Sequence, residues 1–368
     1  MENTLKTELQ LHGYNSSKQL DYGCILQSMT FEDVVYLNQH IHCAESVEIV
    51  LLEDEFTSLE ELRDKINKFS LAEYFQDERT FGVRSLRKGR HEFNQVNLSQ
   101  AVAAGISRAI VAEGIKPKAN LKHPDLLFQS RLHDLHFLLS LNTTGDFQSD
   151  AASLPYQHQA PIKRSLAAGL LFNSNYNKSG FLFDPMCGGG TIALEAFYIQ
   201  EQIAISSIRS TPFAYENHHY KQDHEIPKGR SKLEFPNGLE EVILGDSSRN
   251  KIRGAIENLA HYNMKERARF YRGNSIKMGY LAEDKAVPSI VVNPPYGIRV
   301  KNPKDVDDLY VDFAKKCFNI GAEEVMAITP RKRAWLQSFE DASYNIESIT
   351  AVDFAGLPTS FIKAKRIN

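Results

Sequence analysis

The sequence predicts an α/β protein in which a mostly parallel sheet, covered by helices on both faces, follows a smaller α+β module. Three observations lead to this fold class. From residue 180 onward, short apolar runs alternate with helical patterns, as in strand–helix–strand units. The last two apolar runs lie close together and suit an antiparallel hairpin. With 368 residues, the chain exceeds the usual size of one hydrophobic core, so two or three domains are expected.

The first half of the chain is predicted to hold two units. Short strand-like pieces and a helix over 31–41 come first, and a second helix follows over 59–69. A connector containing Gly145, Pro155 and Pro161 then leads to a helix over 165–172. The predicted divisions are an N-terminal ferredoxin-like region (1–69), a second α+β unit (70–145), a connector with a helix (146–179) and the α/β domain (180–368).

Seven strands are expected in the α/β domain, near residues 180, 242, 269, 289, 325, 349 and 361. Helical patterns separate the first five, which favours parallel pairing through crossover connections. The final pair, 345–353 and 360–366, is expected to form an antiparallel hairpin at one edge. Hydrophobic residues make up 42% and charged residues 24% of the chain, as in ordinary globular proteins.

A glycine-rich turn follows the first strand of this domain. The strand at 180–184 leads into Met186, Cys187 and three glycines, and a helical pattern begins at Thr191. Glycines in such a turn let the backbone approach a ligand closely. No Gly-Lys-Ser/Thr follows, which argues against a phosphate-binding P-loop. Asp184 ends the strand, where its carboxylate would lie close to an ammonium group of a ligand.

A second acid, Asp246, ends the next predicted strand at 241–246. Its carboxylate is well placed to accept hydrogen bonds from a ribose diol. An aspartate after a strand more often stabilises a turn or caps a helix, and from Asp246 alone both interpretations stand.

The most informative motif is Asn293-Pro294-Pro295-Tyr296, which follows the apolar run 287–292. The exocyclic amine of a base is a poor nucleophile because its lone pair is delocalised into the ring. If Asn293 Oδ1 and the Pro294 carbonyl each accept one N–H, the lone pair is localised and aimed at an incoming methyl group. The prolines remove two N–H donors and keep this segment out of a sheet ladder. Tyr296 would stack on the base; the alternative is a strand that ends in a rigid turn.

These motifs carry a family resemblance when they are taken together. Residues 184–191, Asp246 and 293–296 resemble the S-adenosylmethionine pocket and catalytic motif of Rossmann-fold amino-methyltransferases. The segment 81–93, with the helical pattern 98–110 and the strand-like 126–131, resembles a THUMP domain, an RNA-binding module. The combination is similar to the THUMP-containing guanine-N2 methyltransferases of tRNA and of large-subunit rRNA. Residues 160–163 and 213–216 also resemble that family.

The resemblance implies a fold, a cofactor and a set of site residues. The fold is a Rossmann-fold methyltransferase with a mostly parallel seven-stranded sheet and an antiparallel edge hairpin, after a ferredoxin-like/THUMP module. The implied cofactor is S-adenosylmethionine, held by Pro161, Asp184, Met186, Cys187, Gly188, Gly190, Thr191, Asp246, Asn274, Ser275 and Asn293. The implied catalytic residues are Asn293, Pro294, Pro295 and Tyr296. The implied RNA-binding residues are Arg84, Arg87, Lys88, Arg90, Lys116, Lys118, Lys122 and Arg299.

The chain departs from the family pattern at four places. An Arg-Gly-Tyr-Arg element is missing after Gly145, and no leading strand is expected at the N-terminus. Asn274 stands where an Asp commonly meets the adenine amino group, and Ser248 replaces the usual second acid after Asp246. A carboxamide oxygen can still accept the adenine hydrogen bond, but without charge.

Our leading hypothesis from the sequence is an S-adenosylmethionine-dependent RNA guanine-N2 methyltransferase, with tRNA favoured over rRNA. An adenine-N6 methyltransferase acting on DNA or RNA would use the same amine geometry. A cofactor-binding RNA-binding protein without catalysis is a further alternative. Methylation of a pyrimidine carbon would need a cysteine nucleophile, and Asn293 stands at that position. The target nucleotide must be unpaired or flipped out of a duplex.

Charge and cysteine usage bound the partners and the compartment. The formal net charge of −3 indicates that RNA binding depends on local basic patches. The four cysteines lie far apart, which argues against disulfides and structural zinc and for a reducing cytoplasm. No apolar run is long enough for a membrane span, so a cytoplasmic protein is expected. His218, His219 and His224 have no metal-ligand spacing, so no metal is expected. The sequence leaves the oligomeric state open.

Overall fold

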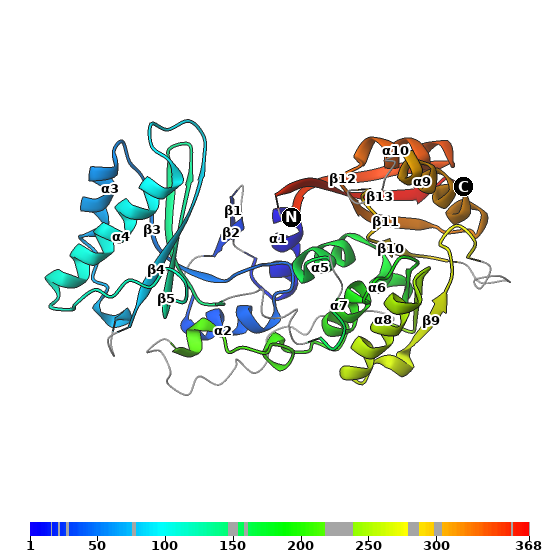
Figure 1. Cartoon of the computed structure of the whole chain (residues 1–368), viewed down its shortest axis with the longest axis horizontal. Helices are drawn as coiled ribbons and strands as arrows, with labels where there is room; N and C mark the ends of the chain where they lie inside the picture. The colour runs from blue at the N-terminus through cyan, green and yellow to red at the C-terminus, as the bar shows by residue number, and fades with distance from the viewer. Residues whose placement is uncertain are drawn as a thin grey trace.

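The computed structural model describes residues 1–15, 17–20, 23–26, 29–75, 79–145, 154–157, 161–217, 238–278, 287–297, 304–354 and 356–367. Two lobes lie side by side along the long axis of the molecule (Figure 1). The lobe formed by the earlier part of the chain contains a four-stranded sheet, and the other contains a seven-stranded sheet. In the described part of the chain, no helix is long and apolar enough to cross a membrane.

The seven-stranded sheet confirms the predicted fold class and every predicted strand. Its order is β12-β13-β11-β10-β7-β8-β9. The pairs among β9, β8, β7, β10 and β11 are parallel, whereas β13 runs antiparallel to both β11 and β12. The strands are β7 (Phe181–Asp184), β8 (Glu241–Asp246), β9 (Ala268–Arg272), β10 (Ile290–Val292), β11 (Glu324–Thr329), β12 (Tyr344–Phe354) and β13 (Leu357–Arg366).

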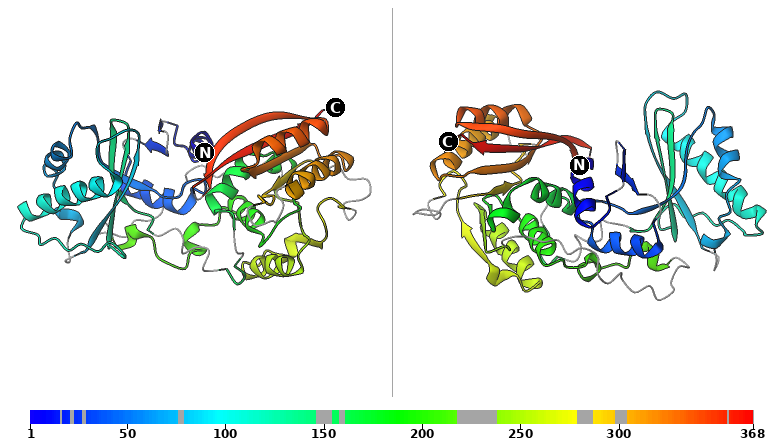
Figure 2. Two further views of the ribbon diagram at one scale, coloured as in Figure 1. Left: turned by 45° about the horizontal axis from the view of Figure 1, so that its top comes forward. Right: turned by 180° about the vertical axis from the view of Figure 1, so that it is seen from behind.

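Helices cover both faces of this sheet (Figure 2). One apolar cluster packs α5, α7 and α8 on one face, and a second cluster packs α9 and α10 on the other. Strand β7 has β8 on one side and β10 on the other, so the strand order reverses there. Such a reversal opens a crevice at the carboxyl ends of the strands, where ligands usually bind. The helices are α5 (Arg164–Asn173), α6 (Tyr176–Ser179), α7 (Thr191–Gln200), α8 (Arg249–His261), α9 (Lys304–Asn319) and α10 (Lys332–Asp341).

The smaller sheet has the order β3-β6-β5-β4 and carries its helices on one face, where they share one core. Its elements are β3 (Glu48–Glu55), α3 (Leu59–Ile66), β4 (Phe81–Lys88), α4 (Gln95–Ala112), β5 (Leu126–His133) and β6 (His136–Asn142). Strand β3 pairs with β6, and α3 packs beside α4. The sheet therefore includes residues before position 70, where the sequence placed the start of this unit, because pairing with a strand so distant in sequence leaves no local signal.

The N-terminal residues form a helix where the sequence suggested strand-like pieces. Helix α1 (Glu2–Leu11) precedes a small hairpin of β1 (Ser17–Leu20) and β2 (Gly23–Leu26), and α2 (Phe31–His40) follows. The side chains of Thr4 and Asn173 are joined by a hydrogen bond of 2.8 Å, which ties α1 to α5. Burial of one helical face against another element outweighs weak local propensity here.

A buried polar cluster links the N-terminal region to the larger lobe. Glu8 accepts hydrogen bonds from the backbone N–H groups of His42 and Cys43, at 2.7 and 2.8 Å. His42 Nδ1 lies 2.5 Å from Glu195 Oε1, and Arg164 Nε donates to Glu195 Oε2 over 2.9 Å. Burial alone would raise the pKa of Glu195, but Arg164 and His42 lower it overall. Removal of one partner would leave an uncompensated buried charge.

Candidate active site

The glycine turn between β7 and α7 requires glycine at two positions. Gly188 has φ 54° and Gly190 has φ 83°, in the left-handed region that L side chains rarely adopt. A Cβ on Gly190 would lie 3.0 Å from Leu259 Cδ1 of α8. The turn is also tied to the neighbouring strand, because the N–H of Cys187 donates to the Gly245 carbonyl over 2.9 Å. The backbone is therefore held close to the carboxyl end of the sheet.

Asp246 holds the glycine turn to the start of α8. Its Oδ2 accepts from the N–H of Gly188 over 3.2 Å, and its Oδ1 accepts from the N–H of Ser248 over 2.9 Å. Lys251 Nζ lies 3.6 Å from Oδ2. In this structure Asp246 thus stabilises a turn, which is one of the two roles that the sequence allowed. An ionised carboxylate has about four acceptor positions, so further hydrogen bonds from a diol remain open to it.

Asp184 is almost fully buried at the end of β7, and its Oδ1 accepts a hydrogen bond from the N–H of Met186 over 3.1 Å. Burial raises the pKa of Asp184 to about 8; the Met186 hydrogen bond opposes this shift and Asp246 adds to it. The group is mostly neutral near pH 7 and would ionise when a cation binds beside it. Burial also raises the pKa of the Cys187 thiol, so this cysteine is not an activated nucleophile.

The Asn-Pro-Pro-Tyr segment follows β10 at the same end of the sheet. Asn293 and Tyr296 are half-buried, Pro294 is buried and Pro295 is exposed. Tyr296 Oη donates to Asn293 Oδ1 over 2.7 Å, so the oxygen expected to bind a base amine already has a partner. The Tyr296 ring meets Phe354 edge to face at a centroid distance of 6.1 Å. Burial raises the pKa of Tyr296, which keeps its hydroxyl protonated as a donor.

The residues predicted to bind adenine form a local turn after β9. Asn274 is exposed, and its Oδ1 accepts from the N–H of Ile276 over 3.0 Å. Ser275 is buried, and the N–H of Gly273 donates to the Asp246 carbonyl over 3.1 Å. This turn is thus attached to the end of β8, next to the glycine turn.

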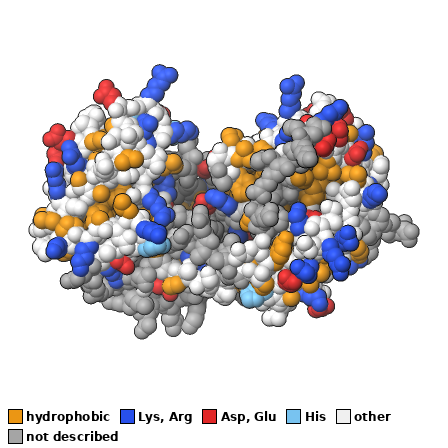
Figure 3. Space-filling model, viewed as in Figure 1, with side chains coloured by type: hydrophobic (Ala, Val, Ile, Leu, Met, Phe, Trp, Pro, Cys, Tyr) orange, Lys and Arg blue, Asp and Glu red, His pale blue; other side chains and the backbone are white. Residues whose placement is uncertain are grey.

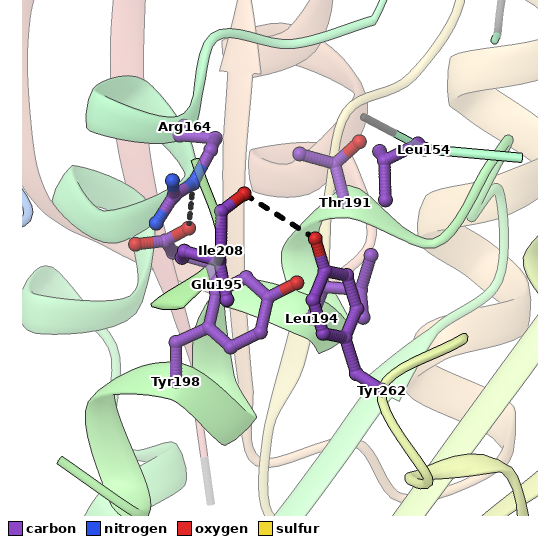
Figure 4. Close-up of a pocket in the computed structure, with 8 residues that line it drawn as sticks. All are labelled: Leu154, Arg164, Thr191, Leu194, Glu195, Tyr198, Ile208 and Tyr262. Carbon is purple, nitrogen blue, oxygen red and sulfur yellow. Dashed lines mark hydrogen bonds and ion pairs between the residues drawn. The ribbon is translucent and has the colours of Figure 1, made fainter. Parts of the chain in front are cut away.

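The remaining predicted cofactor residues are Pro161, Met186 and Thr191. Pro161 is exposed at the end of the connector, and Met186 is half-buried against the apolar cluster of α9 and α10. Thr191 opens α7 and lines a small cavity on the side of α7 that faces α5 (Figure 4). That cavity contains the Arg164–Glu195 ion pair and holds no other residue of the predicted site. It is separate from the Asn-Pro-Pro-Tyr segment.

Sequence reasoning missed one contact between the connector and the glycine turn. Asn258 of α8 is buried; its Oδ1 accepts from the N–H of Tyr156, and its Nδ2 donates to the carbonyls of Tyr156 and Gly189, at 2.9 to 3.0 Å. The Tyr156 ring occupies the space where a Cβ of Gly254 would lie. The available signal was a polar residue on the apolar face of α8, one turn after a glycine.

The predicted RNA-binding residues fall into two separate groups. Four lie along β4 and just after it, and Arg87 donates there to the Gly89 carbonyl. The other group is exposed in the loop after α4, where Ala119 bridges to Phe81 at the opposite end of β4. Arg84 lies three residues along β4 from Phe81 and Lys88 lies seven, so the two groups are about 10 to 25 Å apart along the strand. Lys and Arg side chains are scattered over both lobes in Figure 3, and Arg299 lies outside the described residues.

In the parts of the chain that the structure describes, no group of three or more His, Cys, Asp or Glu side chains could hold a metal ion. The predicted histidines 218, 219 and 224 lie outside those parts.

Comparison with known proteins identifies the family. Residues 153–357 match the model of the RMKL-like methyltransferase domain, which covers more than half of the chain. The chain belongs to this methyltransferase family. Residues 56–142 match the THUMP domain, so the match includes α3, which lies before residue 70, and leaves β3 just outside it. The suspected THUMP-containing methyltransferase family is thereby confirmed.

Similar proteins align over nearly the whole chain. A tRNA (guanine(6)-N2)-methyltransferase of Methanocaldococcus jannaschii is 22% identical over 98% of this chain and 96% of its own length. A protein of the same name from Archaeoglobus fulgidus is 27% identical over 89% and 79%. The Ribosomal RNA large subunit methyltransferase K/L of Buchnera aphidicola is 25% identical over 86% of this chain, which spans about half (47%) of that protein.

Solved structures share the fold. A possible methylase from Clostridium difficile 630 superposes with a TM-score of 0.81 at 21% identity, covering 100% of this chain and 96% of that one. The methyltransferase SMU.472, solved with SAH, superposes with a TM-score of 0.78 at 18% identity, covering 100% and 95%.

Proposed function

We propose that this protein is an S-adenosylmethionine-dependent RNA methyltransferase that methylates the exocyclic N2 amine of guanine in tRNA. One observation carries the proposal: the Asn-Pro-Pro-Tyr segment and the glycine turn follow adjacent parallel strands, β10 and β7. In a chain of the methyltransferase family, this arrangement places an amine-binding motif beside a turn whose backbone a cofactor can approach closely. The THUMP domain and the guanine-N2 names of the two archaeal relatives support RNA, tRNA and guanine as the substrate.

The residues at the strand ends fit the cofactor. Asp184 is a buried carboxyl whose pKa is raised, so a bound ammonium group would stabilise its charged form. Gly190 packs against α8 without space for a side chain. A turn without side chains lets a ligand approach its backbone closely. S-adenosylmethionine would supply an electrophilic methyl group. We assign Asp184, the glycine turn and Asp246 to its binding.

The catalytic segment would act by exchanging one hydrogen bond for another. Asn293 Oδ1 accepts from the Tyr296 hydroxyl in this structure, and a base amine would replace that donor. The Pro294 carbonyl would accept the second N–H, and the nitrogen lone pair would then point at the methyl group. The released Tyr296 ring would stack on the base. No general base is needed, because the methylated amine loses its proton readily.

RNA recognition would be divided between the lobes. The target guanine enters the pocket only from an unpaired region or after flipping. The THUMP domain would hold another part of the RNA through the basic group along β4 and the loop group of Lys116, Lys118 and Lys122. Because Arg87, Lys88 and Arg90 lie at the end of β4 away from the loop group, the two groups would contact separate phosphates and so set the distance to the target.

The test is product analysis with purified full-length protein. Labelled S-adenosylmethionine is supplied with transcribed tRNAs, transcribed large-subunit rRNA fragments or unmethylated DNA, and the nucleosides are identified by mass spectrometry. N2-methylguanosine in tRNA is the expected product. N2-methylguanosine in rRNA alone would change the substrate, and N6-methyladenine would refute the guanine assignment. RNA and cofactor binding without any product would refute catalysis.

A further inference from the structure

A chain of hydrogen bonds reaches the Asn-Pro-Pro-Tyr segment from the neighbouring strand. Tyr310 of α9 donates from Oη to the Pro295 carbonyl over 2.8 Å. The same Oη lies 3.0 Å from Thr329 Oγ1 at the end of β11. The backbone N–H of Arg331 donates to Thr329 Oγ1 over 3.0 Å. Tyr310 and Thr329 are both fully buried, so water does not compete for the bond between their hydroxyl groups.

Each hydrogen bond in this series has only one possible donor. A carbonyl oxygen only accepts, so the Tyr310 proton is directed at Pro295. Thr329 must then donate to Tyr310, while its own oxygen accepts from the N–H of Arg331. Every group has a partner, and the loss of either hydroxyl would leave a buried polar group unsatisfied.

Strand register and ring packing fix the positions of both hydroxyl groups. Val292 pairs with Ala327 across the parallel strands β10 and β11. Thr329, two residues beyond Ala327, therefore lies level with Pro294, two residues beyond Val292. The Tyr310 ring packs edge to face on Trp335 at a centroid distance of 4.9 Å. Neither hydroxyl depends on the Asn-Pro-Pro-Tyr segment for its position.

The bond to Pro295 determines where the preceding carbonyl points. Only the two backbone torsions of Pro295 separate the Pro294 and Pro295 carbonyl groups. The proline ring fixes φ at about −65°. The hydrogen bond from Tyr310 to the Pro295 carbonyl then holds ψ of Pro295. The two prolines have no N–H groups through which a sheet could hold this segment. The Pro294 carbonyl is thereby held in one direction.

We propose that Tyr310 and Thr329 are positioning residues that aim the Pro294 carbonyl at the amine of the target base. This inference rests on the proposed function, in which that carbonyl accepts one of the two amine hydrogens. Neither residue touches RNA or cofactor. A misdirected acceptor lowers the rate of methyl transfer and leaves substrate binding intact, because binding uses other contacts.

The test removes each hydroxyl while keeping the shape of the side chain. Tyr310→Phe and Thr329→Val should each lower kcat on the order of ten- to a hundredfold. KM for RNA and Kd for S-adenosylhomocysteine should stay within about twofold. Thr329→Ser retains the hydroxyl and should retain kcat. The double variant Tyr310→Phe/Thr329→Val should be no slower than the slower single variant, because both act through one carbonyl.

Tyr344→Phe is the matched control. Tyr344 is equally buried and donates from Oη to the Ala322 carbonyl over 2.7 Å, beside the opposite end of β11. Its loss should lower Tm as Tyr310→Phe does, but it should leave kcat unchanged. A kcat within twofold of wild type for Tyr310→Phe, with Tm lowered as in the control, would refute the positioning role.

The two proposals can fail separately. Rates are compared with wild type on the same substrate, so the positioning role is tested whichever base is methylated. The identity of the product tests the proposed function. A wild-type protein that methylates no nucleic acid would overturn both.

Discussion

The buried carboxyl group of Asp184 predicts a pH-dependent affinity for the cofactor. Burial raises its pKa to about 8, a Met186 hydrogen bond opposes the shift and Asp246 adds to it. An ammonium group bound beside Asp184 favours the carboxylate, so affinity should follow the ionised fraction of the free protein. That fraction is about 1% at pH 6 and about 9% at pH 7. The ligand's own α-amino group stays mostly charged in this window, because its ordinary pKa is about 8.

Calorimetry with S-adenosylhomocysteine measures this effect. The Kd of the wild-type protein should fall about five- to tenfold from pH 6 to pH 7. Titrations at pH 7 in two buffers of different ionisation enthalpy should show a net release of protons on binding. Asp184→Asn cannot ionise, so its Kd should not change over the same window. A wild-type Kd that is constant, with no proton released, would refute the placement of an ammonium group beside Asp184.

The same carboxyl should affect the stability of the unliganded protein. Its folded pKa lies above the ordinary value of 3.8, so its stabilising contribution is complete below that pH and is lost as pH rises through about 8. The free energy of unfolding of the wild-type protein should therefore fall as pH rises between these limits. Thermal unfolding of wild type and Asp184→Asn should therefore differ in slope with pH, and equal slopes would contradict the raised pKa.

Substitutions at three further positions test the glycine turn, the connector and the tyrosine–asparagine bond. Gly190→Ala introduces a Cβ at φ 83° and should lower the free energy of unfolding by about 1–3 kcal/mol in chemical denaturation; an unchanged midpoint would contradict the left-handed conformation. Asn258→Leu removes the three hydrogen bonds of a buried side chain and should lower the free energy of unfolding by about 2–4 kcal/mol in the same assay. A loss under about 1 kcal/mol would argue against the contact between the connector and α8. Tyr296→Phe frees Asn293 and keeps the ring, so its kcat should equal or exceed wild type, whereas Tyr296→Ala should lose at least about tenfold in kcat/KM. Equal losses in both Tyr296 variants would show that the hydroxyl acts in catalysis.

The sequence was sufficient for the larger sheet because its strands are local apolar runs with clear ends. Residues 180–184 and 241–246 are short, and each ends in an acid, so the strand boundaries and the position of Asp184 follow directly. The parallel direction of the first five strands and the antiparallel hairpin at the edge then follow from the crossover rules. The order of the strands in the sheet does not, because it depends on contacts between residues far apart in the chain.

The sequence was insufficient where a contact joins residues far apart in the chain. Strand β3 gains its place only by pairing with β6, about ninety residues later. Asn258 and Tyr310 look like ordinary helix residues until the connector and the Pro295 carbonyl are packed against them. The Tyr296–Asn293 hydrogen bond was also missed, because the base-stacking interpretation considered the ring and not the hydroxyl.

A crystal structure of the protein with S-adenosylhomocysteine and a guanosine-containing RNA would test the central claim most directly. The measured quantity is the distance from Asn293 Oδ1 to the guanine N2 nitrogen. We expect about 2.7–3.2 Å, with the Tyr296 hydroxyl displaced from Asn293 and the Pro294 carbonyl at a similar distance on the other side of N2. A guanine bound in the pocket while Tyr296 still donates to Asn293 would contradict the account.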